Sequence, residues 1–315
     1  MMKKKVKINF ADFWKAWNKT DNPFWNLLSR KYDLELSEKP DILFYSYFGN
    51  EFRNYDCIRV LFQGENVRPN FKECDFAFSF DHIPDNPRNY RLPLYYLYDD
   101  VNKLTSPKDP EKIAASKTKF CAFVFSNKYC SKRNNFFKKL SKYKKVDSGG
   151  AVFNNIGGKV ENKLNFIKDY KFTIAFENSS YPGYTTEKIF QPMLVNSIPI
   201  YWGNPLVYED FNTKSFINFH DYKNEEELIE KIIEVDQNPD LYLEMLSQPY
   251  FPNNELNEYV KEENILKQLD YIVDSIQQIN PVANRYKLAP IWVKYTKRRM
   301  MQINRKLIYF VNSIF

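Results

Sequence analysis

The chain has 315 residues, which is long enough for two domains that each bury a core. Hydrophobic residues make up 43% and aromatic residues 17% of the chain, which indicates a folded rather than a disordered protein. Neither a G-x-G-x-x-G nor a G-x-x-x-x-G-K-[ST] motif is present, which argues against dinucleotide oxidoreductases and P-loop ATPases.

The net charge of +7 is concentrated at the C-terminus. From Arg285 onward there are eight Lys or Arg and no acid, so subtracting +8 from +7 leaves −1 for the rest of the chain. A nucleic-acid-binding fold needs its basic surface on the folded body. We therefore expect no nucleic-acid partner.

The cysteines and histidines point to no metal. The four cysteines form no C-x-x-C pair and there are only two histidines, so we expect buried thiols in a reducing cytoplasm. The basic N-terminus has no apolar h-region behind it, and no stretch approaches about 18 apolar residues. We expect neither a signal peptide nor a membrane-spanning helix.

Short apolar runs predict a Rossmann-like α/β domain over residues 1–110. A second such domain is predicted over 118–280, after a charged, proline-containing linker. The expected strands of both domains are 6–10, 41–47, 59–63, 76–80, 120–125, 146–150, 172–176, 198–202 and 216–220. The expected helices are 23–31, 133–143, 164–170, 225–235, 239–246 and 258–279. Two such domains suggest a cleft between them.

The stretch 171–205 organises the second domain. It predicts a strand at 172–176, a polar turn, a helix that begins near Thr186 with Thr185 as its cap, and a further strand. A turn that leaves a strand's carboxyl end lies where open α/β sheets bind ligands. Lys188 falls in the first helical turn, which favours negative charge, so either an anion lies nearby or the lysine head is solvated.

Several motifs occur in one order along the chain. They are Gly64-Glu-Asn-Val-Arg-Pro-Asn-Phe71, Leu92-Pro-Leu-Tyr-Tyr96, Ser126-Asn127 with Arg133-Asn134, F-x-x-x-F-E-N-S-x-x-x-x-Y-x-T-E-K from Phe172 to Lys188, and Ile198-Pro-Ile-Tyr-Trp-Gly203. This set resembles the bacterial α-1,3-fucosyltransferases of glycosyltransferase family 10, over about residues 40 to 222. The resemblance implies an α/β fold of GT-B architecture, in which 1–110 is the acceptor domain and 118–280 the GDP-sugar-binding domain. It also implies transfer of L-fucose from GDP-fucose with inversion. Pro192 departs from the family, which has a small residue there, and predicts a kink.

The resemblance also assigns roles to residues. Glu65 is implied to be the base that takes the acceptor's proton; its alternative is a capping or surface glutamate. Arg133 and Lys188 are implied to clamp the diphosphate, with no metal or other cofactor, and the chain has no D-x-D. A surface arginine is the alternative for Arg133. Glu187 is implied to be the second catalytic carboxylate, which contacts either the ribose hydroxyls or the developing oxocarbenium ion. The remaining implied donor contacts are Tyr184 (phosphate or sugar), and Asn178 and Asn127 (donor or turn only).

The family expectation for the acceptor is the 3-hydroxyl of GlcNAc in an N-acetyllactosamine-type oligosaccharide or lipid-linked glycan, as in Lewis antigens or lipopolysaccharide. Whether the linkage is α-1,3 alone or also α-1,4 stays open. Two alternatives remain: a GT-B enzyme that uses another nucleotide sugar, and a non-catalytic glycan-binding relative. A binder has no need of a base, so the combination of Glu65, Arg133, Glu187 and Lys188 speaks against the second.

The 285–315 tail mixes eight cations with aromatic and aliphatic side chains. This composition is typical of a helix that lies on anionic lipid. We therefore expect a cytoplasmic protein attached peripherally to the inner face of the membrane. The alternative is a tail that packs on the folded body.

Liposome co-sedimentation tests the tail hypothesis. We expect the full chain to sediment with anionic vesicles and a version that ends near Val282 to stay in the supernatant, because the eight cations and their apolar neighbours are then lost. Equal partitioning of both forms would contradict membrane binding by the tail.

Overall fold

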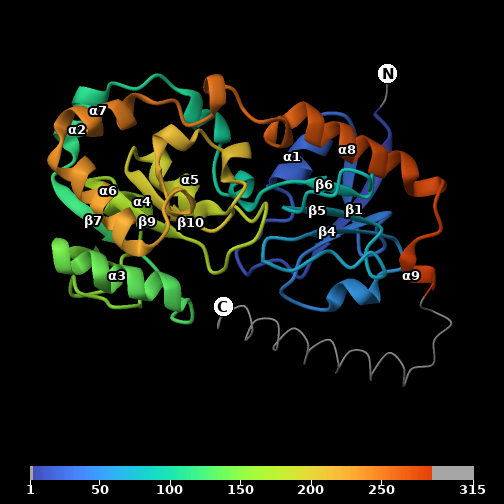
Figure 1. Ribbon diagram of the computed structural model, residues 1–315. Helices are drawn as coiled ribbons and strands as arrows, with labels where there is room; N and C mark the ends of the chain where they lie inside the picture. The colour runs from blue at the N-terminus through green and yellow to red at the C-terminus, as the bar shows by residue number, and fades with distance from the viewer. Residues whose placement is uncertain (1–2, 286–315) are drawn as a thin grey trace. The chain divides into compact units, whose positions relative to one another are not determined.

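Two parallel β-sheets form the framework of the computed structural model, which describes residues 3–285 (Figure 1). The described chain divides into two units, one made of residues 3–99 with 258–285 and the other of residues 100–257. The predictions for the 285–315 tail lie outside the described residues, apart from Arg285 at the end of the last helix. In the described part, no helix is both long and apolar enough to cross a membrane.

The first unit has a six-stranded sheet in the order β2-β1-β3-β4-β5-β6, with every neighbouring pair parallel. The strands are β1 (Lys5–Ala11), β2 (Asp33–Leu36), β3 (Ile42–Tyr45), β4 (Ile58–Phe62), β5 (Phe76–Ser79) and β6 (Asn89–Arg91). The sequence predicted the four inner strands, which are largely buried apolar runs. It missed both edge strands, because these are short and half-exposed and lack such a run.

Helices α1 (Pro23–Ser29) and α8 (Glu262–Asp274) pack together on the first unit. Arg30 at the end of α1 forms an ion pair of 2.5 Å with Glu262. The sequence placed this helix, predicted over 258–279, in the second domain. That assignment was wrong because an apolar stripe shows that a helix has a buried face, not which sheet covers it. Helix α9 (Val282–Arg285) follows, and the backbone N–H of Val282 donates to Asp75 at 2.8 Å.

The second unit has a five-stranded parallel sheet in the order β11-β10-β9-β7-β8. Its strands are β7 (Lys119–Phe123), β8 (Val146–Ser148), β9 (Tyr170–Phe176), β10 (Ile198–Trp202) and β11 (Ile217–Asn218). The sequence predicted all five, but the last is two residues long instead of 216–220. Tyr170 begins β9, whereas the sequence included it in a helix over 164–170.

Helices cover both faces of this second sheet. On one face, buried side chains of α3 (Ser131–Tyr143), α6 (Glu225–Gln237) and α7 (Pro239–Ser247) share a core with β7, β9 and β10. On the other face lie α4 (Lys163–Ile167) and α5 (Glu187–Leu194), which contact each other. Helix α2 (Pro110–Ser116) lies in the segment predicted to be a linker, and it packs on α7. Pro192 lies inside α5, which ends two residues later.

Both strand orders contain a point where the chain reverses its direction of winding. In the first sheet it lies between β1 and β3, and in the second between β7 and β9. Ligands of open α/β sheets bind outside the carboxyl ends of strands at such points. The α/β class and the two parallel sheets predicted from the sequence are confirmed. The four cysteines are buried free thiols, as expected: Cys57, Cys74, Cys121 and Cys130.

Candidate active site

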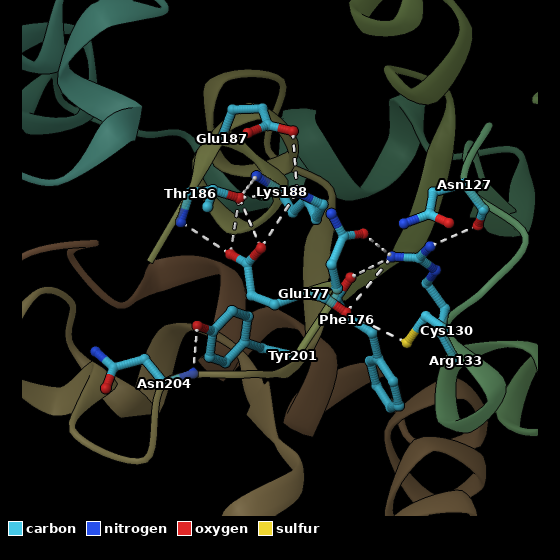
Figure 2. Close-up of polar contacts among 11 residues, drawn as sticks. Asn127, Cys130, Arg133, Phe176, Glu177, Thr186, Glu187, Lys188, Tyr201 and Asn204 are labelled. Atoms are coloured by element: carbon cyan, nitrogen blue, oxygen red, sulfur yellow. Dashed lines mark hydrogen bonds and ion pairs between the residues drawn. The ribbon is translucent and has the colours of Figure 1, made fainter. Parts of the chain in front are cut away.

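Polar side chains gather at the carboxyl ends of β7 and β9, the reversal point of the second sheet (Figure 2). Arg133 is the third residue of α3, the helix that follows β7. Glu177 comes directly after β9, and Glu187 and Lys188 begin α5. The topology therefore brings together residues that are more than 50 positions apart in the sequence.

Glu177 is the centre of this group. Its side chain is wholly buried, and its carboxylate accepts hydrogen bonds from the Thr186 backbone N–H at 2.8 Å and the Thr186 hydroxyl at 2.7 Å. Burial raises the pKa of the Glu177 carboxyl. Thr186 also caps α5 by accepting from the Lys188 N–H. The sequence assigned the cap to Thr185, which instead donates its hydroxyl to Asp210 at 2.6 Å.

Lys188 lies between two carboxylates. Its ammonium is 3.2 Å from the Glu177 carboxylate and 3.3 Å from that of Glu187, and its side chain is only 12% exposed. Burial lowers the pKa of Lys188, but the charges of Glu177 and Glu187 outweigh burial and raise it overall. Conversely, burial raises the pKa of Glu187, and the charges of Lys188 and Lys163 lower it overall. The alternative of a solvated lysine head is wrong.

Arg133 is fully enclosed, so the alternative of a surface arginine is also wrong. Its guanidinium donates to the Asn178 side chain at 3.0 Å and to the backbone carbonyls of Asn127 at 2.8 Å and Phe176 at 3.2 Å. Burial lowers its pKa. Its Nε is buried and has no hydrogen-bond partner within the described chain. Arg133 therefore holds the two strand ends together around one unsatisfied donor.

The other predicted donor contacts differ in where they lie. Asn178 is half-buried against Arg133, whereas Asn127 uses its side chain to accept from the Tyr129 N–H at 2.9 Å. Tyr184 is buried in the turn before α5. The site thus brings together Arg133, Asn178, Glu187 and Lys188 most directly.

A second buried network fixes the turn that carries these residues. The Asn204 side chain accepts from the Gly183 N–H at 2.6 Å and donates to the Thr185 hydroxyl at 2.9 Å. Gly203 has no room for a side chain, because a Cβ there would lie 2.8 Å from the Glu177 Cβ. The loop after β10 therefore holds the turn after β9 in one conformation.

Sequence reasoning missed Glu177 and Lys163. Lys163 is the first residue of α4, half-buried, and forms no hydrogen bond or ion pair with any residue that the structure describes. Burial lowers the pKa of Lys163 to about 8, while the nearby Glu187 carboxylate raises it. The three helices that follow β7, β8 and β9 thus each carry a cation in their first turn. A helix N-terminus disfavours positive charge, so this repeated placement was a signal that the sequence contained.

Glu65, the predicted base, belongs to the first unit. It follows β4 after two residues and is half-buried. Its backbone carbonyl accepts from the Gln63 side chain at 2.8 Å and from the Val67 N–H at 2.6 Å. These bonds fix the backbone of Glu65, and its role as a base stays a prediction. Among residues 3–285, no group of three or more His, Cys, Asp or Glu is arranged to hold a metal ion.

Two family models cover most of the chain. The model of the α-(1,3)-fucosyltransferase FucT N-terminal domain matches residues 8–98, and that of the glycosyltransferase family 10 (fucosyltransferase) C-terminal region matches residues 114–279. The chain belongs to glycosyltransferase family 10. The family resemblance predicted from the sequence motifs is thereby confirmed.

Curated relatives support the same family. The chain is 34% identical to α-(1,3)-fucosyltransferase FucT of Helicobacter pylori, over 76% of this chain and 59% of the relative. It is 29% identical to α-(1,3)-fucosyltransferase B of Drosophila melanogaster, over 60% of this chain and 48% of the relative. The chain therefore spans about half to three fifths of the length of these relatives.

Solved structures match over nearly the whole chain. A crystal structure of α1,3-fucosyltransferase with GDP-fucose is 30% identical, with a TM-score of 0.76 over 89% of this chain and 94% of that one. A crystal structure of α1,3-fucosyltransferase with GDP is 29% identical, with a TM-score of 0.74 over 89% of this chain and 92% of that one. The GT-B assignment made from the sequence is confirmed.

Thr186 supports both the Glu177 carboxylate and the start of α5, so its hydroxyl is a test of the site's architecture. We expect Thr186→Val to lower the free energy of unfolding by about 2 kcal/mol, because a cap and a buried donor are lost together. Thr186→Ser keeps the hydroxyl and should lose far less. Urea denaturation of both variants measures this. A loss in Thr186→Ser as large as that in Thr186→Val would contradict a dominant role of the hydroxyl, because Ser keeps the hydroxyl and Val keeps the methyl group.

Proposed function

We propose that this chain transfers L-fucose from GDP-fucose to a hydroxyl of an acceptor glycan, with inversion at the anomeric carbon. The main support for this proposal is the cationic site at the reversal point of the second sheet, because the chain belongs to glycosyltransferase family 10. The similarity to a crystal structure that holds GDP-fucose supports the same donor. The curated relatives are longer than this chain, so we base the proposed activity on the residues that this chain contains.

The donor's diphosphate would meet the cations of the second unit. Lys188 and Lys163 are partly accessible, whereas Arg133 is enclosed and fixes the loops around them. Three cations face two carboxylates, Glu177 and Glu187, so these side chains together carry an excess positive charge that suits an anion. Glu187 then lies where it can accept hydrogen bonds from the donor's ribose or stabilise a cationic sugar. We propose that these side chains take the place of a metal ion.

The chemistry assigned to Glu65 is general-base catalysis. The carboxylate takes the proton of the acceptor hydroxyl while its oxygen forms a bond to the anomeric carbon of fucose. The bond from that carbon to the β-phosphate oxygen breaks, and GDP leaves with the negative charge. Lys188 and Lys163 stabilise this negative charge.

The expected acceptor is the 3-hydroxyl of GlcNAc in an N-acetyllactosamine-type glycan, as in Lewis-type or lipopolysaccharide structures. Names of relatives that specify an α-(1,3) linkage support this regiochemistry over α-1,4. The composition of the 285–315 tail supports attachment at the inner face of the cytoplasmic membrane, where lipid-linked glycans are exposed.

Transfer from GDP-fucose is the central test. We expect the purified full chain to fucosylate N-acetyllactosamine from GDP-fucose in the presence of EDTA. Glu65→Gln should bind GDP like the wild type yet lose turnover by a factor of about 100 or more, because the amide cannot accept the proton. Mass spectrometry and NMR of the product report the transfer and the linkage, and titration calorimetry reports GDP binding.

Three outcomes would contradict the proposal. Transfer from GDP-mannose but not from GDP-fucose would assign another donor. Loss of activity with EDTA that Mg²⁺ restores would contradict metal independence alone. Loss of GDP affinity in Glu65→Gln, with unchanged turnover of the bound donor, would remove Glu65 from the role of base.

The pH dependence of GDP binding tests Lys163. A bound diphosphate raises the pKa of its ammonium above about 8, so binding takes up a proton and GDP affinity falls as pH rises through 8. We expect affinity about tenfold weaker at pH 9 than at pH 7. The charges of Glu187 and Lys188 on α5, of Glu177 directly after β9 and of Arg133 on α3 also act on Lys163. Variants are therefore needed to separate the contribution of Lys163 itself.

Lys163→Arg carries a charge that does not titrate in this range, so it should keep GDP affinity and flatten the pH dependence. Lys163→Ala should bind GDP about tenfold more weakly at pH 7 and also lose the dependence. Lys159→Ala, on the exposed loop just before α4, is the matched control. An unchanged pH profile in Lys163→Ala would exclude contact with the diphosphate.

A further inference from the structure

Four aromatic side chains gather at the reversal point of the first sheet, and none of them has a role in the functions assigned so far. Phe13, Trp14 and Trp17 follow β1, and Phe48 follows β3. The rings of Phe13 and Trp17 stack with centroids 4.1 Å apart, Trp14 meets Trp17 edge-on at 4.9 Å, and Phe48 lies 6.4 Å from Trp14. We call these four residues the aromatic cluster.

The aromatic cluster is open to solvent. Phe48 is 56% exposed, and the other three side chains are half-buried. The indole N–H of Trp17 is buried and has no hydrogen-bond partner in the described chain. Contiguous apolar patches on a protein surface often mark sites that bind a ligand or partner, and this cluster is one such group of adjacent rings.

Hydrogen bonds to Asp12 connect the two loops that carry the cluster. Asp12 has a left-handed backbone with φ of 59°, which is unfavourable for a residue with a side chain. Its carboxylate accepts from the backbone N–H groups of Glu51 at 3.0 Å and Phe52 at 2.9 Å, and its carbonyl accepts from that of Phe48 at 3.1 Å. Asp12 thus ties the loop after β1 to the loop after β3, and so joins the two halves of the cluster.

The cluster also borders the strand that leads to Glu65. The ring of Phe13 lies 6.4 Å from that of Phe62, the last residue of β4, and Glu65 follows three residues later. The Ser46 hydroxyl donates to the Phe62 carbonyl at 2.9 Å and joins the ends of β3 and β4. All of these residues belong to the first unit.

We propose that the aromatic cluster is the platform on which the acceptor glycan lies, with its rings stacked against the C–H faces of neutral sugar rings. Sugars present flat apolar C–H faces between their hydroxyl groups, and aromatic faces pack well against them. A neutral glycan fits better than an anion, because the four rings carry no charge. The inference rests on the proposed function, since it places the acceptor hydroxyl beside Glu65.

Acceptor kinetics test the platform in the full chain. With N-acetyllactosamine as the probe, Phe48→Ala and Trp14→Ala should each raise the acceptor KM about tenfold. The KM for GDP-fucose and the affinity for GDP should stay at the wild-type values, because those sites lie on other residues. Phe48→Tyr and Trp14→Phe keep an aromatic face and should restore most of the acceptor affinity. Tyr208→Ala removes an equally exposed aromatic ring from the second unit and is the control.

Other results would overturn the platform. An unchanged acceptor KM in both alanine variants removes the cluster from acceptor binding, and an equal rise in the donor KM shows a general loss of structure. If the wild type transfers no fucose, the proposed function fails separately. Saturation-transfer NMR with N-acetyllactosamine then decides: signal lost in Phe48→Ala but kept in Tyr208→Ala supports the platform, and no signal from the wild type contradicts it.

Discussion

The buried carboxylate of Glu177 is the interaction on which the second unit's site depends. A charge that is removed from water needs compensation, and here it comes from the Thr186 hydroxyl and N–H and from the Lys188 ammonium. These contacts fix where α5 begins and which way Lys188 points. Because Gly203 has no side chain, the Glu177 side chain can occupy the space next to it.

The same constraint explains why cations are tolerated at helix starts. Positive charge in a first turn opposes the helix dipole, yet α3, α4 and α5 carry Arg133, Lys163 and Lys188 there. Arg133 is compensated by carbonyls and Lys188 by carboxylates. Lys163 forms no hydrogen bond or ion pair with the described residues, so it is the cation for which an external anion would make the largest difference.

Both sheets place functional side chains at the point where the strand order reverses, but the two sets of side chains differ in chemistry. At its reversal point the second sheet has charged side chains in a buried polar network, and the first has aromatic rings held by a strained aspartate. We propose that the first set binds a diphosphate and the second neutral sugar rings. Both depend on loops that cross from one strand end to its neighbour, since no single strand supplies a complete site.

The sequence by itself determined the inner strands and the family, and it singled out Lys188 as unusual, because apolar runs, ordered motifs and a misplaced charge are local signals. It did not determine that Thr186 rather than Thr185 caps α5, or that α8 packs on the first unit. Nor did it single out Glu177, Lys163 or the aromatic cluster. Each of these depends on a partner distant in the chain, and side-chain periodicity reports that a face is buried without stating against what.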